Sequence, residues 1–294
     1  MSELSNFSNQ LADAVERAGK SIVMVNGRER QPASGIVFGA DLILTADHVL
    51  EREDNLSVRT HDGRTVAAQF AGRDPSTDLA VLKAPGLNLP AIETAQPARV
   101  GNITLAVGRP DGDGLQASLG AISLVSGPVK LGHGTQLDGF IRTDATPYPG
   151  FSGGPLIDAG GAAYGVVTTG LLRGGEAIAI PMSIALRVAQ TLAEKGSIKR
   201  GFIGVVTQQV KLPAAQRTGA NETGLLVMKV EEGAPAEKAG VMVGDILVSV
   251  DGKPVSHADE LLAALAGRAG QSIPVQVLRG GTLTALQVEV GERK

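Results

Sequence analysis

The feature that most constrains the fold is a succession of short, β-branched runs separated by turn-forming residues. Between residues 20 and 181 the chain reads SIVMV, GIVF, LILTA, LSVRT, TVAAQF, LAVLK, ITLAV, LGAISLV, GFIRT, AYGVVTT and AIAI. The intervening NGR, HDG and DPS segments favour turns. Strands this short and this frequent predict an antiparallel barrel or sandwich, because alternating βαβ units would place helices between them.

Two helices flank this β-rich region, and a second β-rich unit follows it. Apolar residues recur at helical spacing over residues 3–18, as Leu4, Phe7, Leu11 and Val15. A second helix is expected from about residue 183 to 194, with Ser183 as its N-cap. The last strands read FIGVVT, GLLVMKV, DILVSV, IPVQVL and LTALQVEV, with short helices between them. Since 294 residues suit two domains, we expect a helical segment at 1–19 and domains at 20–196 and 197–294.

Composition argues against several classes of protein. A net charge of −3 and an aromatic content of 3% with no Trp disfavour a nucleic-acid partner. The chain has no Cys, which excludes disulfides and thiolate zinc sites, and it has no H-E-x-x-H motif. We therefore expect no metal and no cofactor.

The start of the chain has no basic stretch followed by an apolar run, and no window approaches the apolar length of a membrane span. We expect neither a signal peptide nor a membrane span. As the sequence stands this predicts a cytoplasmic protein, and a periplasmic or other extracytoplasmic one if an export signal has been removed.

Ser152, in the segment GFSGGPL, is the candidate nucleophile. Glycines beside a serine allow backbone N–H groups to approach a substrate carbonyl and bind its oxyanion. A simple glycine-rich turn between strands is the alternative interpretation. The segment also matches the G-x-S-x-G elbow of α/β-hydrolases, but that fold places its catalytic His after the Ser. Only His257 follows Ser152, in the second unit, so this interpretation is poor.

The general base is sought among the four histidines. His48 follows the apolar run LILTA, which would hold it rigidly. His61 lies in a predicted hairpin turn, His133 in a glycine-flanked loop, and His257 at the start of a predicted helix. His48 is therefore the strongest candidate.

The orienting acid is sought among the aspartates. Asp78 opens the apolar run DLAVLK, so its backbone is fixed. We expect Asp74 to be solvated in a turn and Asp47 to point away from its neighbour His48. Asp144 is expected to brace the loop before Ser152.

The order His48, Asp78, Ser152 is that of chymotrypsin-like proteases. The segments SGIVFGADLILTADHVL, STDLAVLK, TDATPYPGFSGGPLID, EAIAIPMSIALRV, RGFIGV and VGDILVSVDGKPV resemble the HtrA/Deg serine proteases, over about residues 19–291. The resemblance implies a mainly β fold, with a chymotrypsin-like double β-barrel at 20–196 followed by a PDZ domain, an α+β, partly open barrel, at 197–294. It also implies a trimer assembled through the protease domain.

The resemblance further implies an ATP-independent serine endopeptidase that degrades unfolded or exposed polypeptides. Ser152 would be the nucleophile, His48 the base and Asp78 the orienting carboxylate. The expected oxyanion donors are the N–H groups of Gly150, Phe151 and Ser152. A loop at 172–180 would shape an apolar specificity pocket, whose expected residues are Thr146, Ala177, Ile178, Ala179 and Ile180.

One residue departs from the family pattern, which usually has Asn immediately before the nucleophile. Phe151 stands there instead, and it can form neither the contacts of Asn nor a salt bridge with a freed N-terminus. How the oxyanion turn is held is therefore an open question, with the Pro147–Tyr148–Pro149 sequence as a candidate stiffener. The departure keeps alive an alternative function, a catalytically weak chaperone-like or peptide-binding protein on the same fold.

In the PDZ-like unit, the resemblance assigns a carboxylate-binding loop to Gly201, Phe202, Ile203, Gly204 and Val205. Their N–H groups would receive a peptide C-terminus while the peptide adds a strand to the sheet. A helix at about 258–265 would form the other wall of the groove. The expected role of this unit is to recruit substrate or to regulate activity.

Overall fold

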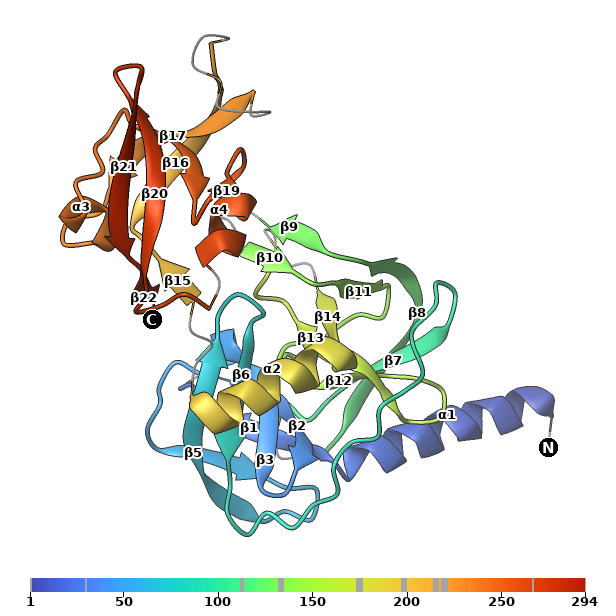
Figure 1. The fold of residues 1–294 in the computed structure, drawn as a ribbon. Helices are drawn as coiled ribbons and strands as arrows, with labels where there is room; N and C mark the ends of the chain where they lie inside the picture. The colour runs from blue at the N-terminus through green and yellow to red at the C-terminus, as the bar shows by residue number, and fades with distance from the viewer. Residues whose placement is uncertain are drawn as a thin grey trace. The chain divides into compact units, whose positions relative to one another are not determined.

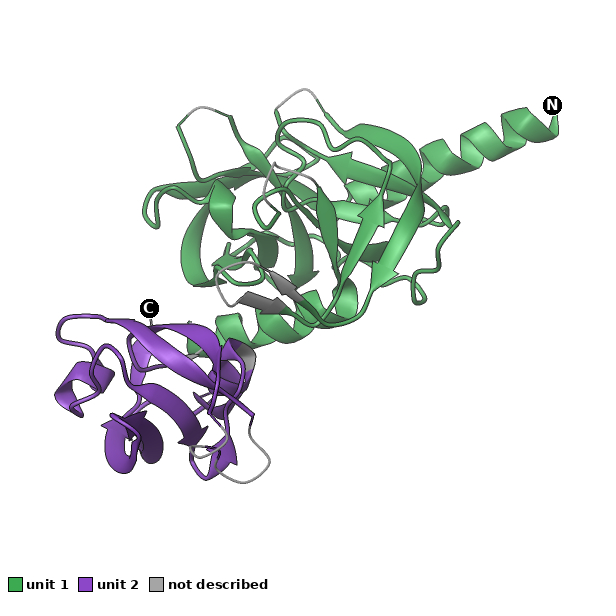
Figure 2. Cartoon of the chain, turned by 90° about the horizontal axis from the view of Figure 1, so that it is seen from above, with its two compact units in different colours: residues 1–198 green, residues 199–294 purple. Residues whose placement is uncertain are grey.

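The computed structural model describes residues 2–29, 31–111, 114–131, 135–172, 177–196, 200–213, 217, 222–265 and 267–293. The chain divides into two compact units, residues 1–198 and 199–294 (Figures 1 and 2).

The first unit contains two closed antiparallel barrels, which confirms the predicted double-barrel fold. The first barrel has the strand order β1 (Ile22–Asn26), β2 (Ala33–Gly39), β3 (Leu42–Ala46), β6 (Leu79–Lys83), β5 (Thr65–Asp74) and β4 (Leu56–Arg59). The second has the order β11 (Phe140–Thr143), β14 (Ile178–Pro181), β13 (Ala163–Thr168), β12 (Pro155–Ile157), β7 (Ile103–Gly108) and β8 (Gln116–Ser126). A separate two-stranded ribbon is formed by β9 (Val129–Leu131) and β10 (Thr135–Leu137).

Several strands are buried on both faces, which explains their continuous apolar runs. Successive strand residues point to opposite faces, so Val37 on β2 enters the interior of the first barrel. Its neighbour Ile36 joins an apolar cluster with residues of the second barrel, among them Val107 and Ile180. This shared core fixes the two barrels against each other.

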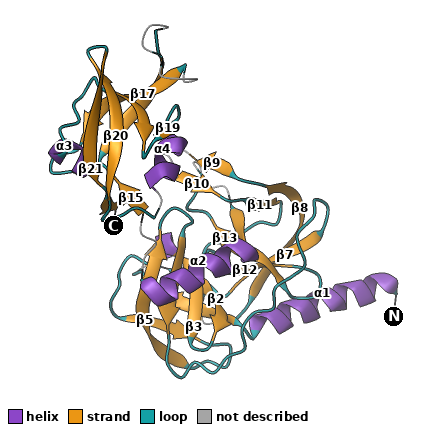
Figure 3. Ribbon diagram, viewed as in Figure 1, coloured by secondary structure: helices purple, strands orange, loops and turns teal. Residues whose placement is uncertain are grey.

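Two helices pack on the barrels (Figure 3). Helix α2 (Met182–Lys195) contacts β5, β6 and β13 and ends at Gly196, which has φ +73°. Its N-cap is Pro181, so the prediction of Ser183 as N-cap is wrong. Pro181 supplies an extended entry without a side-chain hydrogen bond, and Ser183 already lies inside the first turn.

Helix α1 (Glu3–Gly19) agrees with the predicted N-terminal helix, but only its C-terminal half is held by the barrels. Ala14, Ala18 and Gly19 are its buried residues, whereas Leu4 is 75% exposed and Phe7 37% exposed. The N-terminal half of α1 extends beyond the barrels (Figure 1).

The second unit is a sheet with two short helices. The sheet order is β16 (Val205–Lys211), β17 (Thr223–Val230), β18 (Ile246–Val250), β20 (Ser272–Arg279) and β21 (Thr282–Glu289), with β19 (Lys253–Pro254) on β18. β15 (Arg200–Phe202) pairs with β22 (Gly291–Arg293), and the helices are α3 (Pro235–Lys238) and α4 (Ala258–Leu265). Since β16 pairs only with β17 in the described sheet, one of its edges is open to a further strand.

Among the described residues, no helix has the length and apolar character needed to cross a membrane.

Candidate active site

The candidate residues His48 and Asp78 are placed together by two neighbouring strands of the first barrel. β3 and β6 pair with Ala46 opposite Leu79. His48 lies in the short helix η1 (Asp47–Val49) just after β3, and Asp78 immediately precedes β6. The Asp47 N–H donates to the Asp78 carbonyl at 3.0 Å, which ties the two loops together.

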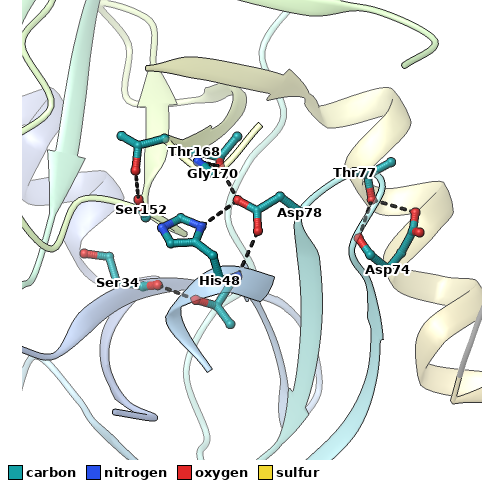
Figure 4. A network of polar contacts seen from close by, with 10 residues as sticks. Ser34, His48, Asp74, Thr77, Asp78, Ser152, Thr168 and Gly170 are labelled. Carbon is teal, nitrogen blue, oxygen red and sulfur yellow. Dashed lines mark hydrogen bonds and ion pairs between the residues drawn. The ribbon is translucent and has the colours of Figure 1, made fainter. Parts of the chain in front are cut away.

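The Asp78 carboxylate holds His48 at two points (Figure 4). Its Oδ2 lies 2.7 Å from His48 Nδ1, and its Oδ1 accepts the His48 backbone N–H at 2.8 Å. Asp78 is buried, at 4% exposure. A carboxylate at Nδ1 selects the tautomer that leaves Nε2 free as an acceptor, which is the state a general base requires.

Thr168 and Gly170 complete the surroundings of this pair, and sequence reasoning missed both. The buried Thr168 hydroxyl donates to Asp78 Oδ2 and accepts the Gly170 N–H at 3.0 Å (Figure 4). A Cβ on Gly170 would lie 2.7 Å from both Asp78 Oδ2 and His48 Nδ1. The only sequence signal for them is the run TTG directly after a buried strand.

Ser152 comes from the second barrel and lies in the loop between β11 and β12. Ser152 and His48 line one cavity of about 340 Å³. The other lining residues are Arg28, Gln31, Pro147, Tyr148, Pro149, Gly150 and Thr169. The described hydrogen bond of the Ser152 hydroxyl is with Thr169 Oγ1, at 3.3 Å. Such contacts of a catalytic residue commonly rearrange only when substrate binds.

Residues 148–151, which we call the oxyanion turn, lead into Ser152. The Phe151 N–H donates to the Tyr148 carbonyl at 3.0 Å, and Gly150 has φ +87°. A Pro at the second position and a positive φ at the third are the marks of a type II turn. The Phe151 N–H, expected as an oxyanion donor, is therefore engaged within the turn.

The two other expected oxyanion donors are the N–H groups of Gly150 and Ser152, and each belongs to a peptide group whose carbonyl is hydrogen-bonded. The Pro149 carbonyl accepts from the Gln31 side chain at 3.2 Å, and the Phe151 carbonyl accepts from the Gly154 N–H at 2.8 Å. In a planar trans peptide the N–H lies opposite the carbonyl. The N–H groups of Gly150 and Ser152 therefore face away from these two contacts.

The residues expected to form the specificity pocket lie elsewhere than in the described cavity. Ile178 and Ile180 are buried in the shared core, and Ala179 is buried in the core of the second barrel. Ala177 is half-buried and Thr146 is exposed. The stretch 173–176 of the expected pocket loop lies outside the described residues.

Other candidates gave mixed outcomes. The expected solvation of Asp74 is wrong, because it is buried and accepts hydrogen bonds from Ser76 and Thr77. Figure 4 shows the contact with Thr77. Asp144 accepts the Ala121 N–H at 2.6 Å and so braces its loop, as expected.

Three histidines remain besides His48. His61 and His257 are exposed, and His133 lies outside the described residues. Within the described ranges, no group of three His, Asp or Glu side chains gathers to hold a metal ion.

In the second unit, the expected carboxylate-binding loop connects β15 to the open-edged strand β16. The Ile203 carbonyl accepts the Ala236 N–H at 2.8 Å, and the Gly204 carbonyl accepts the Glu231 N–H at 2.9 Å. The N–H groups of Gly204 and Val205 lie opposite these carbonyls and so face away from residues 231–236.

Two side-chain features of this loop bear on the expected groove. Gly204 has φ +80°, and a Cβ there would lie 2.2 Å from the Ala234 Cβ. The Ile203 side chain is buried in the core of the unit. Phe202 and Val205 are half-buried.

Comparisons with known proteins agree with this geometry. Residues 33–166 match the family model described as trypsin-like peptidase domain, and residues 226–279 match the PDZ domain model. The solved structure titled "HtrA-type protease AlgW with decapeptide" is similar with a TM-score of 0.76 and 32% identity, over 97% of this chain and 99% of that chain. A serine endoprotease from Yersinia pestis also has a TM-score of 0.76 and 32% identity, over 97% and 98% of the two chains.

Two curated relatives carry the name "probable periplasmic serine endoprotease DegP-like". The one from Ectopseudomonas mendocina is 34% identical, and the match covers 90% of this chain and 58% of the relative. The one from Hahella chejuensis is 34% identical, over 97% of this chain and 61% of the relative. The chain thus spans about 60% of the length of these relatives.

We predict that Thr168→Val lowers kcat/KM for peptide hydrolysis about 10- to 100-fold. The substitution removes a hydrogen bond to the Asp78 carboxylate, and hydrogen bonds to charged groups contribute about 1.5–3 kcal/mol. Steady-state kinetics measures the effect. The control is Thr104→Val, because the buried Thr104 hydroxyl donates to the distant Ile157 carbonyl at 2.7 Å. Equal losses in the two variants would contradict the role of Thr168.

Proposed function

Because this chain belongs to the family of HtrA-type serine proteases, we propose that it is a serine endopeptidase. Ser152 attacks the scissile carbonyl, His48 takes and returns the proton, and Asp78 holds the imidazole. The observation that carries the proposal is that the Asp78 carboxylate contacts both Nδ1 and the backbone N–H of His48. His48 in turn lines the same cavity as Ser152. We assign proteolysis to residues 20–196.

The backbone supplies the remaining catalytic groups. We propose that the Gly150 and Ser152 N–H groups bind the oxyanion. The support is that the Phe151 N–H is bonded within its turn, whereas these two face away from the bonded carbonyls. All steps use side chains and backbone of the chain, so the reaction needs neither ATP nor a cofactor. The open cavity suits an extended segment, which favours unfolded or exposed polypeptides as substrates. The alternative of a catalytically weak chaperone-like protein is not favoured, because each triad residue has a place in this geometry.

We predict that Ser152→Ala and His48→Ala each lower kcat for casein or peptide hydrolysis by about four to six orders of magnitude. Asp78→Asn should cost about four orders, because it leaves the imidazole in the wrong tautomer. Labelling of Ser152 by a fluorophosphonate provides a second readout. His61→Ala is the control, since His61 is exposed in a turn, and an equally inactive His61 variant would refute the assignment of the base.

We propose that cleavage follows small or medium aliphatic residues such as Val, Ala or Ile. The support is that none of the expected pocket residues, Thr146 and Ala177 to Ile180, carries a charge that could hold a Lys or Arg side chain. A peptide library analysed by mass spectrometry should show this preference. Cleavage mainly after Lys or Arg would overturn it.

We propose that residues 197–294 bind the C-termini of peptides, to recruit substrate or to regulate activity. The support is the open edge of β16 beside a loop whose Gly204 and Val205 N–H groups are turned away from its own contacts. Phe202 and Val205, both half-buried, would line the pocket for an apolar terminal side chain. Relatives solved with a tripeptide and a decapeptide add weight to a peptide ligand.

We predict that peptides ending in Val, Leu, Ile or Phe bind the Ser152→Ala chain, and that C-terminal amidation weakens binding about 10- to 100-fold. The amide loses the charge-assisted hydrogen bonds of a carboxylate, and calorimetry measures the difference. Gly204→Ala should abolish binding, while Gly252→Ala, also at positive φ but with open space around it, should retain it. Equal affinity for free and amidated peptides would remove the carboxylate role from this loop.

We propose that the chain assembles as a homotrimer. The support is the exposed apolar stripe of α1, with Leu4 and Phe7, together with the trimers that the family resemblance implies. Light scattering at micromolar concentration should report about three times the 30.1 kDa chain mass. Combined Leu4→Ser and Phe7→Ser should weaken the assembly, whereas the exposed Gln10→Ser should not. A wild-type monomer would refute the proposal.

We also propose a periplasmic location. The support is the printed name of the relatives, which places those proteins in the periplasm. The cytoplasmic location expected from the sequence has no support among them. Fractionation of the native organism tests the proposal, and recovery with cytoplasmic markers would overturn it.

A further inference from the structure

The residue immediately before the nucleophile is anchored by apolar packing. The Phe151 ring is fully buried, at 0% exposure, and is the largest fully buried side chain described. It packs within the core of the second barrel, whose other buried members are Ala106, Ile122, Ile141, Ala145, Leu156, Val167 and Ala179. The backbone of the oxyanion turn is therefore attached directly to a barrel core.

Two neighbours restrict the position of this ring. A Cβ on Gly108 would lie 2.6 Å from Phe151 Cδ1, so the absence of a side chain at Gly108 leaves the room that the ring occupies. On another side, the Tyr148 ring meets Phe151 edge-on, with 5.4 Å between centroids and an interplanar angle of 89°. The first and last residues of the turn are thus joined both by their backbone hydrogen bond and by their rings.

The peptide groups between these two residues are held from the first barrel. The Ser34 hydroxyl donates to the Gly150 carbonyl at 2.8 Å and accepts the Arg109 N–H at 2.9 Å. The Gln31 side chain donates to the Pro149 carbonyl. The Gly150 carbonyl belongs to the peptide bond that joins Gly150 to Phe151. A shift of Phe151 would therefore move this carbonyl away from the Ser34 hydroxyl.

The turn has two alternative geometries with different chemical consequences. A type II turn has a positive φ at its third residue, as Gly150 has, whereas a type I turn has a negative φ there. The change rotates the peptide group between Pro149 and Gly150 by about half a turn. It would redirect the Gly150 N–H away from the oxyanion.

We propose that Phe151 is a positioning residue for catalysis: its buried ring, confined by Gly108 and Tyr148, selects the type II form and holds the Gly150 N–H as an oxyanion donor. The inference rests on the proposed proteolytic function. It answers how the turn is held where the family pattern has Asn, since packing replaces a polar contact.

The test compares Phe151→Ala with Phe151→Leu. Loss of one oxyanion donor lowers kcat about 100- to 1,000-fold, so we expect a loss of this size in Phe151→Ala, with KM changed less than about threefold. Phe151→Leu keeps an apolar anchor and should recover most of kcat. Affinity for a peptide aldehyde, whose adduct with Ser152 carries the oxyanion, should fall in parallel with kcat.

A matched control separates positioning from stability. Ile122 is buried in the same core but lies outside the turn, so Ile122→Ala should lower the melting temperature by a similar amount while keeping kcat within about threefold of the wild type. Kinetics are measured well below the melting temperature of each variant.

A second-site experiment tests the confinement of the ring directly. Gly108→Ala introduces a methyl group against Phe151 and should lower kcat with little change in KM. Combining it with Phe151→Leu, which vacates part of the ring volume, should restore kcat above that of Gly108→Ala alone. This pair of variants decides the proposal even if Phe151→Ala does not fold.

The outcomes are distinguishable. Unchanged kcat in Phe151→Ala, an equal kcat loss in Ile122→Ala, or no recovery in the Gly108→Ala and Phe151→Leu pair would each overturn the positioning role. A wild-type chain without hydrolysis that depends on Ser152 would instead refute the proposed function itself.

Discussion

The site depends on Ser34, because this residue of the first barrel is hydrogen-bonded to the loop that holds Ser152. Its N–H donates to the Ser152 carbonyl at 3.1 Å and its hydroxyl donates to the Gly150 carbonyl at 2.8 Å. Its own carbonyl accepts from the Thr45 hydroxyl at 2.7 Å (Figure 4). Since His48 belongs to the first barrel and Ser152 to the second, these bonds set the registration between base and nucleophile. Gly153 permits the close approach, because a Cβ there would lie 2.1 Å from the Ser34 carbonyl oxygen.

The β-rich class of the fold could be predicted because its signals are local, whereas the double barrel and the PDZ domain were implied by the family resemblance. Alternating or apolar runs of four to eight residues identify strands wherever they pair, and the glycines around Ser152 identify a close backbone approach. The contacts of Thr168 with Asp78 and of Ser34 with Gly150 could not be predicted in this way. Their partners are 90 and 116 residues apart, and a lone Thr or Ser in a strand has no local feature that distinguishes it.

The wrong expectations share a physical origin, which is that tertiary packing overrides local composition. Asp74 precedes a proline, which is typical of a surface turn. It is nevertheless buried, because the Ser76 and Thr77 hydroxyls donate hydrogen bonds that stabilise its carboxylate. Packing also decides placements that composition does not indicate: strand alternation buries Ile178 and Ile180 in the shared core. The Phe151 ring likewise fills a space that Gly108 leaves open.

The buried Asp47 carboxyl, beside His48, interacts with two further buried carboxyl groups, those of Asp74 and Asp78, and the Arg73 guanidinium lies next to it. Burial raises the pKa of the Asp47 carboxyl, the Arg73 guanidinium opposes this rise, and the Asp78 and Asp74 carboxylates add to it. Arg73 Nε lies 3.3 Å from Asp47 Oδ1. A carboxyl whose pKa is raised by folding favours the protonated form, so its ionisation as pH rises opposes folding. Arg73 thus limits the repulsion that a charged Asp47 would exert on Asp78.

The position of Arg73 is restrained by two uncharged groups as well as by carboxylates. Its guanidinium lies 5.0 Å from the Phe70 ring centroid and donates to the Leu50 carbonyl at 3.4 Å. It also approaches the exposed Glu53 carboxylate at 3.5 Å. Cation–π and backbone contacts hold a guanidinium in place without neutralising its charge. The charge of Arg73 therefore still acts on the Asp47 carboxyl.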